Sequence, residues 1–254
     1  MAIRVGVFGA GGRMGATVCE AVAGDPTLEL VAAIDPAHAG ETVEGAVIVA
    51  DPTAIDVELD VVIDFTHVDA ARANVLWAAE HGVHAVVGTS GFGDDDLERF
   101  RAAFTRSNCV IAPNFAIGAV LMIAFAERAA PFFETAEIVE MHHDAKRDAP
   151  SGTAMHTAER IAAASSDWAT DPTEDMVVDG ARGAEGPGGI HVHALRVRGM
   201  VASQEVILGT TGQALTIRHD TYDRSSFMPG VLLAVKAVAD KPGLTVGLDQ
   251  LLGL

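Results

Sequence analysis

Short apolar runs rich in β-branched residues alternate with amphipathic segments over the N-terminal part of the chain. The runs predict strands at residues 3–8, 28–34, 61–65, 83–87 and 109–112. The amphipathic segments predict helices from the end of the first glycine-rich loop to residue 23, at 68–81 and at 97–105. Strands that are apolar along almost their whole length are typical of a parallel sheet covered by helices on both faces. The pattern therefore predicts an α/β domain.

The pattern changes after Asn114. A long apolar helix is predicted at 117–133, a strand at 134–142, a helix ending at Ala164 and a polar loop at 165–189. Strand-like runs follow at 191–198, 204–208 and 214–219, separated by glycine-containing turns, and an apolar helix follows at 228–239. Three successive strands without an intervening helix favour an antiparallel sheet. A second domain of α+β type is therefore expected.

A glycine-rich loop, Gly9-Ala-Gly-Gly-Arg-Met-Gly15, follows the first strand and opens the first helix. Glycines let the backbone approach a pyrophosphate, and the helix start offers unpaired N–H groups. Asp35 ends the second strand, where its carboxylate can accept hydrogen bonds from an adenosine ribose. The alternative is a tight turn with no ligand. The combination of strand, helix and acid favours a dinucleotide.

Two further loops follow later strands of the predicted parallel sheet, at the edge where such sheets bind ligands. They are Gly88-Thr89-Ser90-Gly91 and Ala112-Pro113-Asn114-Phe115. Both are candidates to face the nicotinamide half of the cofactor. Ordinary turn chemistry explains the same residues, and the first loop is what favours the functional interpretation.

The segment 140–154 gathers residues with proton and anion chemistry. His142, His143, Lys146 and Arg147 bring potential positive charge together in an acidic protein. Pro150-Ser151-Gly152-Thr153 begins a helix whose free N–H groups suit a carboxylate. Adjacent histidines are not spaced for one metal-binding helix face, and no Cys or Glu partner completes a zinc pattern, so no metal is expected. A catalytic role for this loop is favoured over a structural one.

The net charge of the chain argues against some classes of binding partner. The chain has 254 residues, with 17 Lys and Arg against 35 Asp and Glu, a formal net charge of −18. Such a surface repels nucleic-acid phosphates and anionic lipid. Its longest apolar stretch, 115–126, is too short for a bilayer span, and no cleavable signal is expected in the segment before the glycine-rich loop. Cys19 and Cys109 are expected to be buried free thiols, and a cytoplasmic location is expected.

The quoted loops together resemble one enzyme family. The pattern His-His-x-x-Lys-x-Asp-Ala-Pro-Ser-Gly-Thr-Ala within 142–154, the glycine loop and the two later loops are similar to those of 4-hydroxy-tetrahydrodipicolinate reductases, also called dihydrodipicolinate reductases. The resemblance extends over essentially the whole chain, including the segment 222–230. It implies reduction of 4-hydroxy-tetrahydrodipicolinate by NADH or NADPH with loss of water, in the diaminopimelate route to lysine.

The same resemblance implies an architecture and residue roles. A Rossmann-type domain is expected from 1–116 plus 227–254, with an inserted α+β domain, 117–226, that binds a small dicarboxylate and assembles a homotetramer. His142 and Lys146 match the catalytic positions, and His143, Gly152 and Thr153 match substrate-binding positions. The positions that match cofactor contacts are Gly9, Ala10, Gly11, Gly12, Arg13, Met14, Gly88, Thr89, Ser90, Ala112, Pro113, Asn114 and Phe115.

Two other functions share only part of these features. Another two-domain dehydrogenase, acting on an amino acid or a semialdehyde, would use the cofactor half but would not require the 140–154 loop. A dinucleotide-sensing regulatory protein would also use the first half, and it gives no reason for His142 and Lys146.

Overall fold

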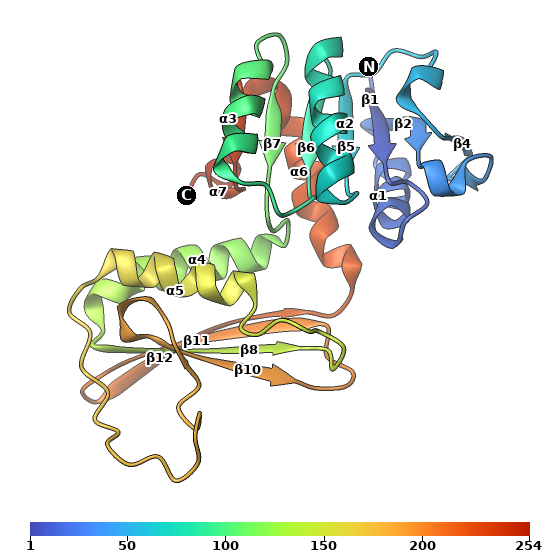
Figure 1. Cartoon of the computed structure of the whole chain (residues 1–254). Helices are drawn as coiled ribbons and strands as arrows, with labels where there is room; N and C mark the ends of the chain where they lie inside the picture. The colour runs from blue at the N-terminus through green and yellow to red at the C-terminus, as the bar shows by residue number, and fades with distance from the viewer. The chain divides into compact units, whose positions relative to one another are not determined.

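The computed structural model describes all 254 residues, which form two compact units. Met1–Ile117 and Arg224–Leu254 make the first unit, and Gly118–Asp223 make the second. Each unit has one sheet and its own apolar core, and the two are coloured by chain position in Figure 1. No helix is both long and apolar enough to span a bilayer.

The first unit is built on an eight-stranded sheet in the order β13-β7-β6-β5-β1-β2-β4-β3. Its strands are β1 (Ile3–Phe8), β2 (Leu28–Ile34), β3 (Thr42–Val43), β4 (Ala46–Val49), β5 (Val61–Asp64), β6 (His84–Val87), β7 (Cys109–Ile111) and β13 (Leu244–Val246). Its helices are α1 (Arg13–Ala23), α2 (Val68–His81), α3 (Asp94–Ala103), α6 (Met228–Ala237) and α7 (Asp249–Leu252). Every strand pair is parallel except β3 with β4, at one edge. The Rossmann-type α/β class expected from the sequence is confirmed.

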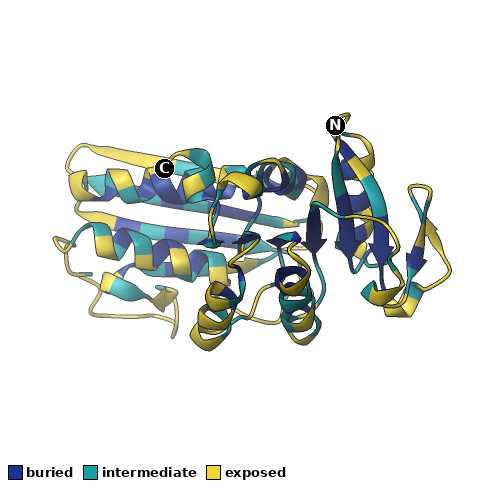
Figure 2. Ribbon diagram, turned by 90° about the horizontal axis from the view of Figure 1, so that it is seen from above, coloured by how far each residue is buried: buried dark blue, intermediate teal, exposed yellow.

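Burial explains why the central strands read as apolar runs. All four residues of β5 and all three of β7 are buried, because helices cover both faces of the sheet. In Figure 2 the strands near the N-terminus are partly dark blue (buried) and partly teal (half-buried), in agreement with the burial of β1 and β2. Cys19 and Cys109 are buried free thiols as expected, and burial raises the pKa of Cys19 to about 12.

The second unit packs helices against a five-stranded sheet in the order β12-β11-β8-β10-β9. Its elements are α4 (Ile117–Ala129), β8 (Thr135–His142), α5 (Gly152–Ala164), β9 (Ala184–Glu185), β10 (His191–Arg196), β11 (Ala202–Thr210) and β12 (Gln213–Thr221). Ile138, Val192 and Val206 project from three adjacent strands into one core, where they meet Ala158 and Ile161 of α5. This core fixes which face of β8 is buried.

The antiparallel arrangement predicted for the three late strands is only partly right. β11 and β12 form an antiparallel hairpin, but β10 pairs in parallel with β8, which lies between β10 and β11. A parallel neighbour requires a crossover connection, and α5 provides it between β8 and β10. The apolar pattern of a strand does not reveal its direction. The helix before β10 was the signal for a parallel pair.

Candidate active site

The glycine loop is a tight turn between β1 and α1. Gly9 has a φ of +77°, a left-handed conformation that side chains other than glycine's rarely allow. A Cβ on Gly15 would lie 1.9 Å from the carbonyl oxygen of Gly9, so the helix could not pack so closely on the loop with any other residue there. Gly12 donates its N–H to the same oxygen at 3.0 Å. The sequence therefore needs these glycines to bring the helix start beside the strand end.

The start of α1 has free hydrogen-bond donors. Gly12 is the N-cap and has no side chain to cap the helix. The backbone N–H groups of Arg13, Met14 and Gly15 make no hydrogen bond within the chain. Together with the positive end of the helix dipole, they suit the negative charge of a pyrophosphate. The loop therefore fits a dinucleotide.

Asp35 lies beside this loop, and its carboxylate accepts from two backbone N–H groups, that of Gly11 at 3.2 Å and that of Ala37 at 3.0 Å. Nδ1 of His38 lies 3.1 Å from Oδ2 of Asp35, although the two make no hydrogen bond. Asp35 thus fixes the geometry of the glycine loop, and each of its oxygens keeps a lone pair for a further donor. The sequence analysis missed His38, because a single histidine four residues after the end of β2 belongs to no recognisable motif.

A pocket of about 580 Å³ opens at the ends of β1, β2 and β5. Its lining includes Gly9 and Gly12 of the loop, Asp35 and His38. Five lining residues that the sequence analysis did not assign to a site come after β5: Phe65, Thr66, His67, Ala70 and Asn74. They follow β5 directly, and their position after a buried strand was the signal that could have found them.

The loop after β6 is hydrogen-bonded to the side chain of Asp64, the last residue of β5. Asp64 is buried, and its Oδ1 accepts from the Thr89 hydroxyl at 2.7 Å and from the N–H and hydroxyl of Thr66 at 3.0 and 2.8 Å. Its Oδ2 accepts from Asn74 at 2.7 Å. The Thr89 side chain is therefore engaged with the protein, and of its predicted neighbours Ser90 is exposed.

The loop after β7 divides into core and surface positions. Ala112 and Phe115 are buried, and the Phe115 ring lies 5.8 Å from that of Phe65. Pro113 is exposed, and Asn114 accepts from the N–H of Ala116 at 2.9 Å. Phe115 thus packs against Phe65, while Pro113 and Asn114 remain accessible to a ligand.

The second group of predicted residues lies at the end of β8, in the second unit. Glu140 and His142 are two residues apart on one strand and so lie on the same face of the sheet. Nδ1 of His142 lies 2.6 Å from Oε2 of Glu140. The Glu140 side chain has no exposed surface, and that of His142 is 17% exposed.

Arg196, at the end of β10, is a site residue that the sequence analysis missed. It is paired in register with His142, and its guanidinium binds Glu140 through two bonds of 2.8 and 2.9 Å. Burial tends to raise the pKa of Glu140, but the hydrogen bonds from Arg196 and His142 outweigh burial and lower it. Glu140 is therefore ionised at neutral pH. Arg196 lies 54 residues from its partner His142 along the chain, so only the parallel β8–β10 pair brings the two together.

Lys146 is not a free cation, although the sequence analysis expected it to form a cluster of positive charge with two histidines and Arg147. Its Nζ donates to both carboxylate oxygens of Asp148, at 2.9 and 2.8 Å. His143 and Arg147 are exposed, and their side chains make no hydrogen bond or ion pair. Acidic residues interleaved in the loop disperse the positive charge that the composition of the segment suggested. We assign no role to Arg147.

Helix α5 begins at Gly152, directly after the loop. Its N-cap Ser151 accepts from the N–H of Ala154 at 3.2 Å through Oγ. The N–H groups of Gly152 and Thr153 have no partner in the chain. Gly152 is exposed, and no atom lies within 4 Å of the place where a Cβ would be. The helix start is thus open for an anion.

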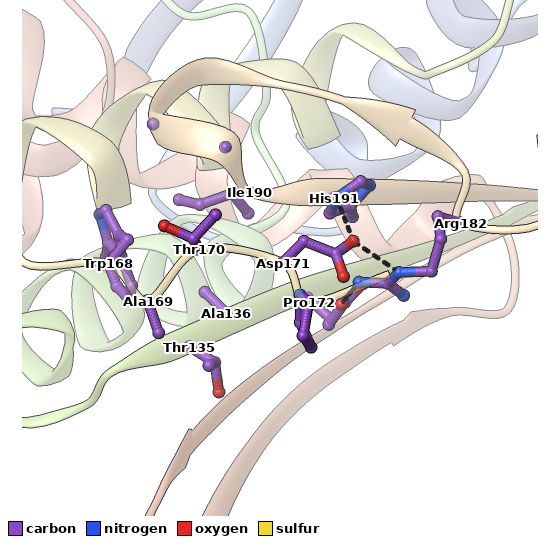
Figure 3. Close-up of a pocket in the computed structure, with 13 residues that line it drawn as sticks. Thr135, Ala136, Trp168, Ala169, Thr170, Asp171, Pro172, Arg182, Ile190 and His191 are labelled. Atoms are coloured by element: carbon purple, nitrogen blue, oxygen red, sulfur yellow. Dashed lines mark hydrogen bonds and ion pairs between the residues drawn. The ribbon is translucent and has the colours of Figure 1, made fainter. Parts of the chain in front are cut away.

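Another pocket of about 250 Å³ lies at the opposite end of β8, where the strand begins (Figure 3). Arg182 is bonded to Asp171 and Glu137, and Nε2 of His191 lies 3.0 Å from Asp171. Every basic side chain in its lining already has an acidic partner. This pocket therefore offers no free positive charge to a dicarboxylate.

Comparison with known proteins decides the family. A model of the N-terminal part of dihydrodipicolinate reductase matches residues 3–115, and a model of its C-terminal part matches 118–252. The chain belongs to the dihydrodipicolinate reductase family. It is 52% identical to 4-hydroxy-tetrahydrodipicolinate reductase of Thermobifida fusca, covering 99% of this chain and 100% of that one. It is 50% identical to the enzyme of the same name from Cutibacterium acnes, with 99% of each covered.

Solved structures agree with this family. Dipicolinate-bound dihydrodipicolinate reductase from Paenisporosarcina sp. TG-14 is 36% identical, with a TM-score of 0.89 over 98% of this chain and 99% of that one. Aspartate semialdehyde dehydrogenase II of Vibrio cholerae is 15% identical with a TM-score of 0.55, which shows a shared fold alone. The resemblance drawn from the sequence is confirmed, as is the expectation of a pyridine-nucleotide-dependent reductase.

Proposed function

We propose that this chain reduces 4-hydroxy-tetrahydrodipicolinate to tetrahydrodipicolinate, with loss of water, in the diaminopimelate route to lysine. Full-length similarity to reductases of that name supports the proposal. The observation that carries it is local: His142, Lys146 and the open start of α5 lie on one short segment of the second unit. This segment supplies proton chemistry and an anion site together.

The first unit is the proposed dinucleotide-binding domain. The free amides at the start of α1 would hold the pyrophosphate, and Asp35 would accept from the ribose. When bound, the nicotinamide nucleotide supplies the hydride. NADH and NADPH are both proposed as cofactors. Asp35 favours the free 2′-hydroxyl of NADH, and no Lys or Arg follows it directly in Pro36-Ala37-His38.

The second unit is the proposed substrate-binding domain. A dicarboxylate needs two sites of positive potential. The N–H groups of Gly152 and Thr153 provide one, with the Thr153 hydroxyl as a further donor, and His143 with Lys146 provides the other. The dipicolinate bound in the related structure is a planar dicarboxylate of this kind.

Lys146 and His142 are the proposed proton-transfer residues. Reduction of the conjugated imine places negative charge on the ring nitrogen, and a proton or a fixed cation must neutralise that charge. The ammonium of Lys146 can donate that proton. Its ion pair with Asp148, whose side chain is 66% exposed, is of the weak surface kind and can open when a substrate carboxylate arrives. His142 would share the same proton.

The decisive experiment is a coupled assay in which the preceding synthase generates the unstable substrate. We expect NADH and NADPH to be oxidised only when that product is present. Oxidation of neither nucleotide in the complete system would refute the proposed function.

Assembly and location stay predictions. The second unit is expected to carry the contacts of a homotetramer in the cytoplasm, as the family resemblance implies. Light scattering at micromolar concentration would detect the tetramer, and a monomer there would contradict it.

A further inference from the structure

One buried carboxylate at the end of β8 has no part in the roles assigned so far. Glu140 projects into the face of the sheet that also carries Ile138, and its side chain has no exposed surface. An ionised group there is costly unless hydrogen bonds compensate. It has them: Arg196 through two nitrogens, His142 at 2.6 Å and the N–H of Ser151 at 3.0 Å.

The bond from Glu140 selects the form of the His142 ring. An ionised carboxylate only accepts hydrogen bonds, so Nδ1 of His142 must carry the hydrogen that it donates. The other nitrogen, Nε2, makes no hydrogen bond within the chain. In the neutral ring Nε2 is therefore the basic atom, available to a proton from outside the protein.

The same carboxylate also holds the end of the reactive loop. Oε1 of Glu140 accepts from the N–H of Ser151, the residue immediately before Gly152 and Thr153. Arg196 adds a bond of 2.6 Å to the carbonyl oxygen of Asp148. His142, just before the segment 143–150, and Ser151, just after it, are thus both hydrogen-bonded to Glu140.

We propose that Glu140, clamped by Arg196, is a positioning residue that sets the tautomer and orientation of His142 and places the start of α5 beside it. This inference rests on the proposed function. It assigns to Glu140 no contact with substrate. Its effect passes through His142 and through the Gly152–Thr153 turn.

The chain offers a matched control on the same strand. Glu137 also binds an arginine and a histidine, Arg182 and His193, the latter at 2.7 Å. Glu137 is an odd number of positions from Glu140 and so lies on the opposite face, where its side chain is 31% exposed. A variant of Glu137 removes an equivalent carboxylate without touching His142.

The test compares Glu140→Gln with Glu137→Gln in the complete enzyme. For Glu140→Gln we expect kcat to fall about tenfold to a hundredfold, the usual cost of losing an orienting partner, with the KM for NADH within about twofold of wild type. The pH profile of kcat should differ from that of wild type, because a neutral amide replaces the carboxylate that contacts the His142 ring. Glu137→Gln should leave kcat and the profile unchanged.

A double variant covers the case in which Glu140→Gln does not fold. Glu140→Gln with Arg196→Met removes both charges, so no unpaired charge is left in the core. It should show the same loss of kcat. The ¹⁵N chemical shifts of the His142 ring give a readout without turnover: hydrogen on Nδ1 in wild type, and a mixture of tautomers in both variants.

Wild-type kcat and pH profile in folded Glu140→Gln or in the double variant would overturn the inference. So would an equal loss in Glu137→Gln, or unchanged ring tautomers. An inactive wild type whose His142 tautomer still depends on Glu140 would refute the proposed function and leave the positioning of the ring supported.

Discussion

Replacing Lys146 by Ala tests whether Lys146 donates a proton in the reaction or only binds a substrate carboxylate. The only side-chain partner of Lys146 is Asp148, which is 66% exposed, so losing this surface pair should have little effect on folding stability. The variant should therefore fold, and its kinetics should report the chemistry. As a general acid, Lys146 contributes a factor of about 10² to 10⁴ to kcat, equivalent to roughly 2.7 to 5.4 kcal/mol.

The assay is the coupled reduction with synthase-generated substrate, followed by NADH absorbance. Arg147→Ala is the matched control, because it removes one positive charge from the next residue, which is exposed and has no partner. We expect it to retain kcat within about twofold, because water and salt screen an exposed charge that has no partner. Binding of NADH, measured by fluorescence, should be unchanged in both variants, since all residues of the proposed dinucleotide site belong to the other unit.

The pattern of losses decides the role. A Lys146→Ala enzyme with wild-type kcat and a raised KM would refute the acid role and leave only carboxylate binding. His142→Gln should lower kcat with less effect on KM. If both residues serve one proton transfer, the double variant should lose less than the product of the single losses. Full multiplicativity would show that they act independently.

Three further outcomes follow from other contacts. NADH should be used at least as well as NADPH, and a preference for NADPH above about tenfold, roughly 1.4 kcal/mol, would contradict the role of Asp35. Pyridine-2,6-dicarboxylate should compete with substrate, and Thr153→Val should weaken this inhibition and raise KM; inhibition of equal strength in the variant would place the carboxylate elsewhere. Because the pKa of Glu140 is lowered on folding, its contribution to stability is complete above the ordinary value of 4.5 and is lost as the pH falls through the lowered value. Urea unfolding at a series of acidic pH values should therefore show a smaller decline in Glu140→Gln than in wild type.

Most strands of the first sheet could be predicted from the sequence because each buried strand is a continuous apolar run followed by a loop. The strands missed there are β3, β4 and β13, of two, four and three residues, which lie at or next to an edge of the sheet. A strand of two or three residues is too short to show a repeating pattern of apolar and polar positions. The 165–189 segment was predicted as loop and holds only the two-residue β9 and a short turn.

In the second unit, local sequence identified candidate residues for proton transfer and anion binding, but it did not show how these residues are paired. Lys146 and Asp148 are neighbours in the motif, yet nothing in the spacing shows that they bind each other. Glu140 belongs to the same segment, but the role proposed for it depends on its ion pair with Arg196. That contact is set by the direction of β10, which is a property of the whole sheet. Long-range charge pairs of this kind lie outside what a motif can encode.

The first unit is built from two separated pieces of chain, so it cannot be completed until the second unit has been synthesised. Strand β13 completes the sheet beside β7, and Lys236 of α6 reaches Asp25 at 2.5 Å. During translation at about 5–20 residues per second, the second unit leaves the ribosome whole while the first still lacks this edge. Until α6 and β13 emerge, β7 has an unpaired side, where strands of other chains could add. The nascent chain is thus most exposed to misassembly in the interval between the two pieces, and a chaperone that covers β7 would act then.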